Sequence, residues 1–419
     1  MRQTPRGGHG RGARALLLAL TAGGLTACGT LLEVEAPSRI LEQTLLQPSN
    51  ATVLVAGAVA DFECAFGNFV LTGATLADEF ADAQANAATW DIDRWTNFPA
   101  TALYATGACG GFGVYTPLSI ARFQADQALK LLDKWTDAEV PGRAALQAQA
   151  AAYAGYSYLL MGEMFCSCAF DLGAELQPAA VFALAEERFT RVITAAGAPA
   201  ELKNLALVGR ARARLNQGKR PEAGADAAQV PVGFVYTAKN TAAAGRAENR
   251  IFRFNNTNGT VTVDSQFRTV RVGTTADPRV NVTDAGRGGS LPTVRLFVQN
   301  KYKSLNDPIP MATWREAALI RAEVAGGATA VQLINQLRTA AGLPAFSSTV
   351  ETEIQAAVRE ERRRELFLEG HRLFDTIRFN LPLIPAAGAN FPNGGGTYGS
   401  NKCLPLPDVE RLNNPSITR

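Results

Sequence analysis

Histidine is nearly absent from this sequence, and its scarcity limits the chemistry that the protein can perform. Only two of the 419 residues are histidines. One of them, His9, lies in an N-terminal segment that we expect to be removed, which leaves His371 alone. A histidine-rich metal site or a Ser-His-Asp triad is therefore nearly excluded unless His371 supplies it. We expect no metal ion, no cofactor and no catalytic residue.

A surplus of charge of either sign is also missing. The chain has 41 Lys+Arg and 38 Asp+Glu. Four of the arginines lie in the N-terminal segment: Arg2, Arg6, Arg11 and Arg14. Taking four from 41 leaves 37 basic residues against 38 acidic ones, so the rest of the chain is close to neutral. Binding to nucleic acid needs a concentrated basic surface, and this balance argues against it.

No apolar run is long enough to cross a membrane as a helix, which takes about 20 residues. The run at residues 15–25 follows the basic segment and is shorter than that. The longest later run, at residues 51–60, ends at Asp61. We therefore expect a protein that is anchored to a membrane rather than one that spans it.

The basic segment, the short apolar run and the small residues after it have the order of a secretory signal. They end in Leu-Thr-Ala-Cys at Cys28, which resembles the bacterial lipobox, whose cysteine is lipidated and becomes the first mature residue. We expect residues 1–27 to be a lipoprotein signal peptide and Cys28 to carry the lipid. Gly29 is not the aspartate that resembles an inner-membrane retention signal, so we expect the outer membrane, with the protein facing the cell exterior. An ordinary signal peptide with a nearby cysteine is the alternative.

Five further cysteines lie in the rest of the chain: Cys64, Cys109, Cys166, Cys168 and Cys403. In an exported protein disulfides are the default expectation, and an odd number leaves at least one cysteine free or paired between molecules. Cys166 and Cys168 do not have CxxC spacing and have no histidine nearby, so structural disulfides are favoured over a redox or metal pair. Cys64 with Cys109 is a first guess, and the connectivity stays open.

Alanine-rich segments with helical periodicity dominate most of the chain. We expect helices at 119–135, 142–165, 178–196, 201–217, 221–229, 313–325, 329–341 and 351–379. Helix pairs with small residues at their contacts are typical of tetratricopeptide-like repeats of about 34 residues. Short β-prone runs lie at 234–236, 251–254, 261–263 and 294–298. The predicted fold class is mostly α, a helical-repeat scaffold with a loop-rich insertion that carries minor β-strands.

These patterns divide the chain into five parts after the signal. They are an N-terminal tether, a helical-repeat region with the ligand loops, a loop-rich insertion, C-terminal helical repeats and a Gly/Pro/Asn-rich tail. In order, they cover residues 28–49, 50–230, 231–310, 311–380 and 381–419. A chain of this length can bury a large core, as one domain or as two lobes.

The most specific string after the signal is EERRRELFLEGHRLFD at residues 360–375. It resembles the C-terminal ER..EL..EG.R..D signature of SusD/RagB-type nutrient-uptake lipoproteins. Family-like pieces elsewhere lie at 144–165, 317–323, 334–338, 404–407 and 414–415. The resemblance covers essentially the whole mature chain. It implies a SusD-like α-α superhelix that captures oligosaccharides, or peptides, at the cell surface and delivers them to a TonB-dependent, SusC-like transporter.

Charged residues of this string lie three or four positions apart on one predicted helix face: Arg362, Glu365, Glu369, Arg372 and Asp375. Opposite signs at that spacing predict a ladder of ion pairs. Gly370 weakens a helix by about 1 kcal/mol relative to alanine, so we expect it to admit a neighbouring backbone or side chain. An acid–base pair with His371 is the alternative, but catalytic groups converge on a cleft, whereas these charges spread along a helix.

A site for sugars needs aromatic faces and polar groups that bind hydroxyls. The best cluster lies within residues 78–98 and contains Trp90, Asp91, Asp93, Arg94, Trp95 and Asn97. Tyr302, near the end of the insertion, is a second candidate. Core packing of Trp90 or Trp95 is the alternative interpretation, and for Tyr302 loop packing is the favoured one.

Two other functions stay in competition with capture of a ligand. A helical-repeat scaffold or adhesin would have no soluble ligand. A glycosidase could use Asp91 and Asp93, but these two carboxylates lie on one element, whereas glycosidases set theirs on opposite sides of the bond, about 5 to 9.5 Å apart. We expect a binding protein and not an enzyme.

Overall fold

The computed structural model of the protein describes residues 45–107, 109, 111–391 and 396–417. The chain forms two units, Met1–Gln47 and Pro48–Arg419, and the features below belong to the second. The predicted signal peptide, Cys28 and most of the predicted tether lie outside the described residues.

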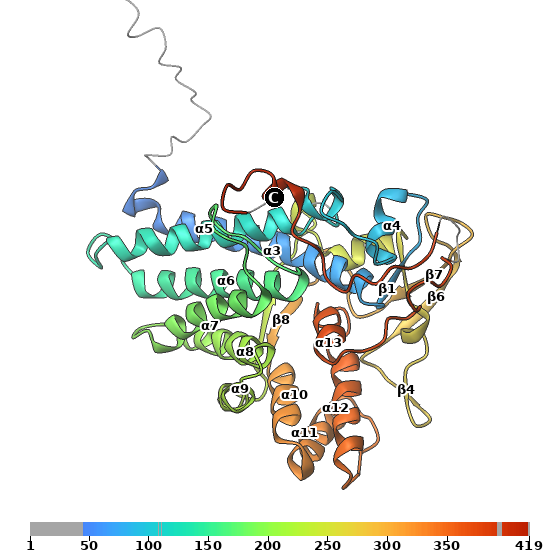
Figure 1. Ribbon diagram of the computed structural model, residues 1–419. Helices are drawn as coiled ribbons and strands as arrows, with labels where there is room; N and C mark the ends of the chain where they lie inside the picture. The colour runs from blue at the N-terminus through green and yellow to red at the C-terminus, as the bar shows by residue number, and fades with distance from the viewer. Residues whose placement is uncertain (1–44, 108, 110, 392–395, 418–419) are drawn as a thin grey trace, which may run out of the picture. The chain divides into compact units, whose positions relative to one another are not determined.

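Helices that follow one another along the chain pack side by side through the first half of this unit (Figure 1). They are α3 (Ala51–Leu76), α5 (Tyr115–Lys134), α6 (Arg143–Met164), α7 (Pro178–Thr194), α8 (Ala200–Asn216) and α9 (Arg220–Ala227). α3 contacts α5 and α6, and each helix from α5 to α8 contacts the next. The predicted mostly α fold is confirmed, and the bounds of α5 to α9 lie within a few residues of the predicted ones.

Small residues let α6 and α7 approach each other closely. A Cβ atom added at Gly155 would lie 2.7 Å from Cε1 of Phe189, and one at Gly162 would lie 2.6 Å from Cε1 of Phe182. Real Cβ atoms do not come so near a ring, so the aromatic rings of α7 occupy the space that these glycines leave. Gly209 of α8 meets the other side of Phe189 in the same way.

The C-terminal helices form a smaller cluster of their own. α10 (Trp314–Ala325), α11 (Gly327–Ala340) and α12 (Glu351–Glu365) share a hydrophobic core, and α10 connects it to α8 and α9. α13 (Arg372–Arg378) instead contacts α3 and α6. The short helices α4 (Ala87–Asp93) and α14 (Asp408–Arg411) lie outside these layers.

Antiparallel pairs of short strands make up the β structure of the described residues. The pairs are β1 (Phe80–Asp82) with β3 (Val261–Val263), β2 (Val235–Ala238) with β8 (Ile309–Thr313), β4 (Arg271–Val272) with β5 (Thr275–Ala276), and β6 (Val282–Gly288) with β7 (Arg295–Gln299). Single helical turns lie at η1 (Pro48–Asn50), η2 (Leu103–Ala105), η3 (Gly245–Ala247) and η5 (Ser265–Phe267).

The prediction of a strand at residues 251–254 is wrong. This segment enters a π-helical turn, η4 (Phe252–Thr257). The side-chain amide of Asn255 donates to the carbonyl oxygens of Val261 and Phe297, at 2.9 and 3.0 Å, and so joins the turn to β3 and β7. The β-prone residues are therefore used in a turn that side-chain hydrogen bonds hold, a feature that periodicity does not reveal.

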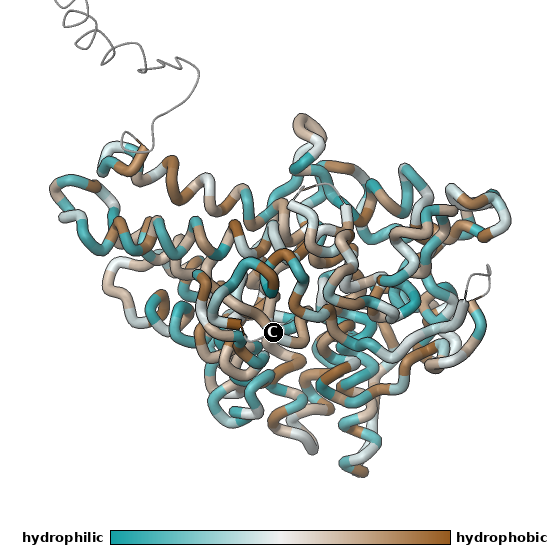
Figure 2. Tube along the Cα trace, turned by 45° about the horizontal axis from the view of Figure 1, so that its top comes forward, coloured by the Kyte–Doolittle hydropathy of each residue, from teal (hydrophilic) through white to brown (hydrophobic). Residues whose placement is uncertain are grey.

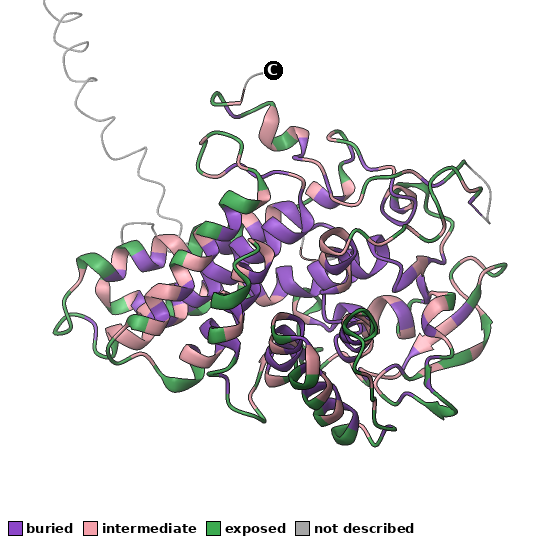
Figure 3. Ribbon diagram, turned by 60° about the horizontal axis from the view of Figure 1, so that its bottom comes forward, coloured by how far each residue is buried: buried purple, intermediate pink, exposed green. Residues whose placement is uncertain are grey.

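α3 is far more apolar than the other helices. Pro48–Leu76 is the one helical stretch among the described residues that is long and apolar enough to cross a membrane. Its second half is almost continuously buried, from Phe62 to Leu76, and it packs against α5, α6 and α13. Figures 2 and 3 show the apolar and buried residues along the inner faces of the packed helices. α3 therefore has the contacts of a core helix.

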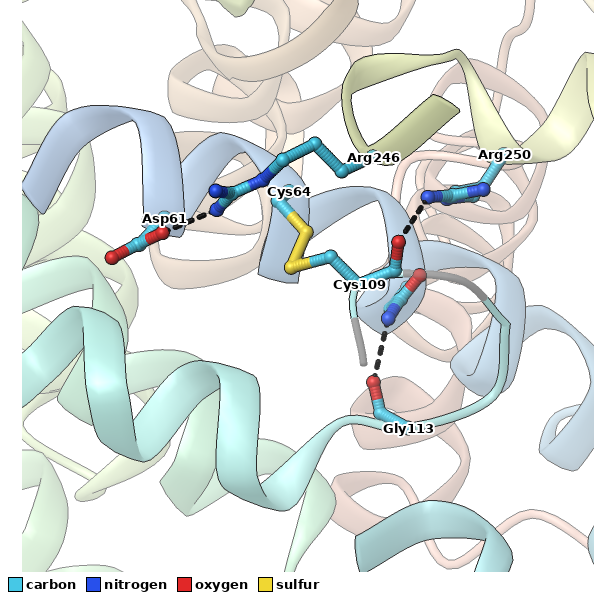
Figure 4. The surroundings of a disulfide bond; sticks show 7 residues. Asp61, Cys64, Cys109, Gly113, Arg246 and Arg250 are labelled. Carbon is cyan, nitrogen blue, oxygen red and sulfur yellow. Dashed lines mark hydrogen bonds and ion pairs between the residues drawn. A yellow bond between two sulfur atoms is a disulfide. The ribbon is translucent and has the colours of Figure 1, made fainter. Parts of the chain in front are cut away.

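Two disulfides tie loops to this helical framework. Cys64 of α3 is bonded to Cys109, and Cys166, just after α6, is bonded to Cys403 in the tail. Around the first bond, Arg250 donates to the carbonyl oxygen of Cys109 at 2.6 Å (Figure 4). Cys168 is a buried thiol, and burial raises its pKa.

The continuous helix predicted over 351–379 is wrong. α12 ends at Glu365 and α13 begins at Arg372, and the turn between them holds Leu368 and Gly370 at φ of 56° and 82°. A Cβ atom at Gly370 would lie 2.7 Å from Cε1 of Phe69. Gly370 therefore does admit a neighbouring side chain, but in a left-handed turn against α3 rather than within a helix.

The predicted ladder of ion pairs is wrong for the same reason. With the helix broken, Arg362 and Asp375 pair with each other across the turn, and the other charges of the string have partners elsewhere in the chain. The pairs are Arg362 with Asp375 at 2.9 Å, Glu365 with Arg279 at 3.0 Å, Glu369 with Lys301 at 2.6 Å, and Arg372 with Asp78 at 3.1 Å. The string thus joins the α12–α13 turn to the insertion and to the end of α3.

Candidate functional site

The predicted cluster lies on a short excursion of the chain between α3 and α5. β1 leads from the end of α3, and α4 follows after a bend. Asp82 of β1 accepts a hydrogen bond from the Thr89 hydroxyl at 2.8 Å, and Gln84 donates to Asp82 and Thr89. The Asn86 side chain accepts from the backbone N–H of residue 88 at 3.2 Å and so caps the start of α4.

Trp90 and Asp91 are the members of the cluster that solvent reaches. Both are half-buried. The Arg94 guanidinium lies 4.1 Å from the centroid of the Trp90 ring and 3.8 Å from that of Phe391. Asp91 accepts from the Thr96 hydroxyl at 2.8 Å. A cation held between two rings orders Trp90 and occupies one of its faces.

Burial removes Trp95 and Asn97 from the predicted ligand site. Trp95 is 2% exposed, and its indole N–H donates to the carbonyl oxygen of Leu76 at 2.7 Å. Asn97 is 1% exposed. Trp95 therefore anchors this excursion to the end of α3, and the core interpretation is correct for Trp95.

Asp93 is also buried, and its carboxyl is shifted towards the neutral form. Burial raises the pKa of Asp93 well above its usual range, and the nearby Asp82 and Asp264 raise it further. Asp91 faces Thr96 at the surface. The two carboxylates thus lie in different environments, Asp93 enclosed and Asp91 half-buried at the surface, and they do not form a pair around a common opening.

Tyr302 is wrongly placed among the predicted ligand residues. It is 3% exposed, and its hydroxyl donates to the carbonyl oxygen of Leu368 at 2.9 Å. Its ring therefore supports the turn between α12 and α13. The favoured alternative of packing is correct, although the contact is with the core and not with a loop surface.

His371 does not supply a base that solvent can reach. It is 4% exposed and lies near Arg212 and Glu316. Burial lowers its pKa well below the usual value, and the positive charges around it, Arg212 first among them, lower it further. The imidazole is therefore neutral and enclosed at neutral pH.

The tail supplies residues of this site that the sequence pattern missed. The backbone N–H groups of Gly399 and Asn401 donate to the carbonyl oxygens of Arg94 and Trp95, at 2.6 and 3.1 Å. These bonds bring Phe391 against Arg94 and Tyr398 to 5.2 Å from the Trp95 ring. The sequence signal for this contact was the presence of two aromatic residues in an otherwise Gly- and Pro-rich tail.

Phe98 is a further residue that the sequence analysis did not single out. It is 52% exposed and follows the buried Asn97. Within the same short segment of the chain, the half-buried Trp90, Asp91 and Gln84 add an aromatic, a carboxylate and an amide group that solvent reaches. We call these four residues the α4 face. Such a set can stack on the apolar side of a sugar ring and bind its hydroxyl groups.

The α4 face is a surface and not a deep cavity. Four grooves on the described part of the surface hold about 560, 420, 310 and 160 Å³, and none of these four is lined by Trp90. The largest lies over α5 and α7, where arginine and lysine alternate with aspartate and glutamate. Most of those arginines are bound to carboxylates, as Arg122 is to Asp171 and Arg188 to Asp126.

Comparison with known proteins identifies the architecture. Residues 316–404, which include most of α10 and all of α11 to α13, match the model of the SusD family. Solved structures of this kind match about nine-tenths of the chain. The chain has a SusD-like fold. The resemblance and the fold predicted from the sequence are thereby confirmed.

Three of these SusD-like structures show how far the likeness extends. A laminarin-binding SusD-like protein is 18% identical, with a TM-score of 0.67, and the match covers 88% of this chain and 98% of that one. Surface glycan-binding protein A from Bacteroides thetaiotaomicron, in complex with laminarihexaose, is 14% identical with a TM-score of 0.67, covering 88% and 98%. A SusD superfamily protein from Parabacteroides distasonis is 12% identical with a TM-score of 0.68, covering 91% and 99%. No curated protein sequence matches the chain.

Proposed function

We propose that this protein binds oligosaccharides at the cell surface and passes them to a TonB-dependent, SusC-like transporter of the outer membrane. The observation that carries the proposal is the α4 face on a SusD-like fold, where Trp90, Asp91 and Gln84 are half-buried and Phe98 is exposed within one short segment of the chain. Two proteins of the same fold, named for binding laminarin and solved with laminarihexaose, support a saccharide as the ligand class.

In this proposal the chain performs no chemistry on its ligand. Lipid on Cys28 keeps the protein at the outer membrane, beside its transporter. The described carboxylates of the α4 region support binding rather than hydrolysis, because Asp93 is enclosed while Asp91 is only half-buried. Turnover of any oligosaccharide by the pure protein would contradict this part of the proposal.

A panel of glycans and peptides tests the proposal. Affinity electrophoresis of the mature protein through gels that contain β-glucan, α-glucan or casein peptides should show retardation by at least one glycan. Trp90→Ala should abolish most of that retardation, because it removes an aromatic face that a sugar ring stacks on.

Trp135→Ala is the matched control, since Trp135 is also half-buried but lies at the end of α5. It should be retarded like the wild type. Retardation by the peptide gel alone would mean that the ligand is a peptide and not a saccharide. Retardation by none of the gels, together with co-purification of other surface proteins, would favour a scaffold or adhesin instead.

A further inference from the structure

The groove between α12, α13 and the start of the tail has an unbalanced charge. It holds about 310 Å³, and three arginines line it: Arg359, Arg363 and Arg372. Two carboxylates, Glu360 and Asp375, also line it. The groove is thus at the lower end of the size of small-ligand sites, which hold about 300 to 1,000 Å³.

Both carboxylates are already bound by more than one arginine. Glu360 accepts from Arg363 at 2.7 Å and from Arg364 at 2.7 Å. Asp375 accepts from Arg362 at 2.9 Å and from Arg378 at 2.9 Å. Their charges are therefore compensated within the fold and leave little negative potential for the rest of the groove.

Arg359 is the arginine of this groove that lacks a carboxylate. Among the residues that the structure describes it makes no ion pair, and its guanidinium lies 5.7 Å from the centroid of the Phe379 ring. Arg372, by contrast, is held by Asp78. One guanidinium with free donors therefore faces the groove from α12.

Apart from Gln266, the remainder of the groove is apolar. Phe379, Leu381, Pro382 and Ile384 line it, and Ile384 is 45% exposed. An apolar floor beside an uncompensated guanidinium matches a ligand that has a hydrophobic face and an anionic group. A neutral sugar would leave the guanidinium without a partner, and a simple ion would leave the floor uncovered.

We propose that this groove binds an acidic sugar unit of an oligosaccharide, with Arg359 on its anionic group and Phe379 and Ile384 against its ring. The inference rests on the proposed function, because it takes the ligand to be a saccharide. The anionic group is a carboxylate, as in a uronic acid, or a sulfate ester. Both are flat or compact oxyanions that a guanidinium binds through paired N–H donors.

Calorimetric titration with three trisaccharides tests this site. The probes are trigalacturonate, its carboxyl-reduced neutral counterpart and a sulfated neutral trisaccharide. The wild type should bind at least one anionic probe about tenfold or more tightly than the neutral one, the size expected of one charge-assisted hydrogen bond. Arg359→Gln should remove this preference, and Arg359→Lys should keep part of it.

Arg321→Gln is the matched control. Arg321 of α10 is half-buried and, among the described residues, also makes no ion pair, but it does not line this groove. It should keep the wild-type preference. Equal binding of anionic and neutral probes by the wild type, or a preference that survives in Arg359→Gln, would overturn the inference.

The same titrations separate this inference from the proposed function. If neutral glycans bind and Trp90→Ala weakens them, but no anionic preference exists, the α4 face stands and the acidic-sugar groove fails. If no glycan binds at all, both fail. A preference for the sulfated probe that depends on Arg359 supports the groove and assigns its anion to sulfate.

Discussion

The helices α6 to α8 and the turn between α12 and α13 are both buried, but different interactions position them. α6, α7 and α8 follow one another in the sequence and meet through glycines that face the rings of Phe182 and Phe189. The turn is positioned by charges whose partners lie 13 residues away, as for Arg362 and Asp375, or 294 away, as for Arg372 and Asp78. Packing of neighbours is local, whereas these ion pairs depend on the complete fold.

The contrast is sharpest at Arg279, in the insertion. It donates to Asp277 at 2.7 Å and to Glu361 and Glu365 of α12 at 2.7 and 3.0 Å, and its side chain is 9% exposed. Arg279→Leu would leave three carboxylates in the core with fewer partners. We expect a loss of about 3–5 kcal/mol in the free energy of unfolding, measured by urea denaturation.

Arg191→Leu tests whether exposure makes the difference. Arg191 pairs with Asp133 between α7 and α5, but the two side chains are 40% and 41% exposed. An exposed pair contributes about 0–1 kcal/mol. Equal losses for the Arg279 and Arg191 variants would contradict the distinction between buried and surface charges.

The Cys166–Cys403 bond joins the end of α6 to the tail that follows α13, across 237 residues. Replacing both cysteines by alanine should lower the free energy of unfolding by about 2–5 kcal/mol, because the unfolded chain regains the freedom of a long loop. Cys168→Ala, at the buried thiol, serves as the control and should cost less. A double variant as stable as the wild type would show that the tail is held by its other contacts alone.

Gly155→Ala tests the glycine contacts of the helical half. The added methyl would lie 2.7 Å from the Phe189 ring, and overpacking of this kind costs about 1–3 kcal/mol. Gly57→Ala in α3 is the control, because its methyl would lie 3.8 Å from Oε1 of Gln124. That variant should be neutral or more stable, since alanine favours the helix. A destabilised Gly57→Ala with a neutral Gly155→Ala would reverse our assignment of close contacts.

The free energy of unfolding should depend on pH through a buried glutamate. Burial raises the pKa of Glu316 to about 8 from an ordinary 4.5, although Arg212 and Arg362 oppose the shift. The folded protein keeps this proton while the unfolded chain releases it. Glu316 therefore contributes stability below pH 4.5 that is lost as the pH rises towards 8. Burial also raises the pKa of Glu79 to about 7, with the same sign.

Glu316→Gln should flatten that slope, because glutamine resembles the protonated acid at every pH. The free energy of unfolding between pH 5 and pH 8 should fall less in the variant than in the wild type. Identical slopes for the two proteins would mean that Glu316 keeps its charge in the folded state.

The sequence was sufficient for the features that depend on local order. Periodicity predicted α5 to α9, and the small residues predicted their close packing. Prediction from the sequence failed where the role of a residue depends on a partner far away in the chain. Nothing near Trp95 indicates that its indole binds the end of α3, and nothing near Tyr302 indicates Leu368 as its acceptor.

The candidate site shows the same division. Trp90 and Asp91 lie at the surface in the predicted segment, and their role in binding stays a prediction. Phe391 and Tyr398 reach the same segment only because the tail folds back over it, some 300 residues later in the chain. The turn at Leu368 and Gly370 was hidden as well, because the charges around it have perfect helical spacing.

Calorimetry of laminarihexaose binding to the mature protein is the most direct test of whether the α4 face binds a saccharide. We expect measurable binding by the wild type. Trp90→Ala should bind at least about fivefold more weakly, with unchanged thermal unfolding, because loss of an aromatic face removes about 1 kcal/mol or more. Other oligosaccharides from the panel replace the hexaose if a different glycan retards the protein in gels. Wild-type affinity in Trp90→Ala, or no binding of any glycan by the wild type, would show that the α4 face is not a saccharide site.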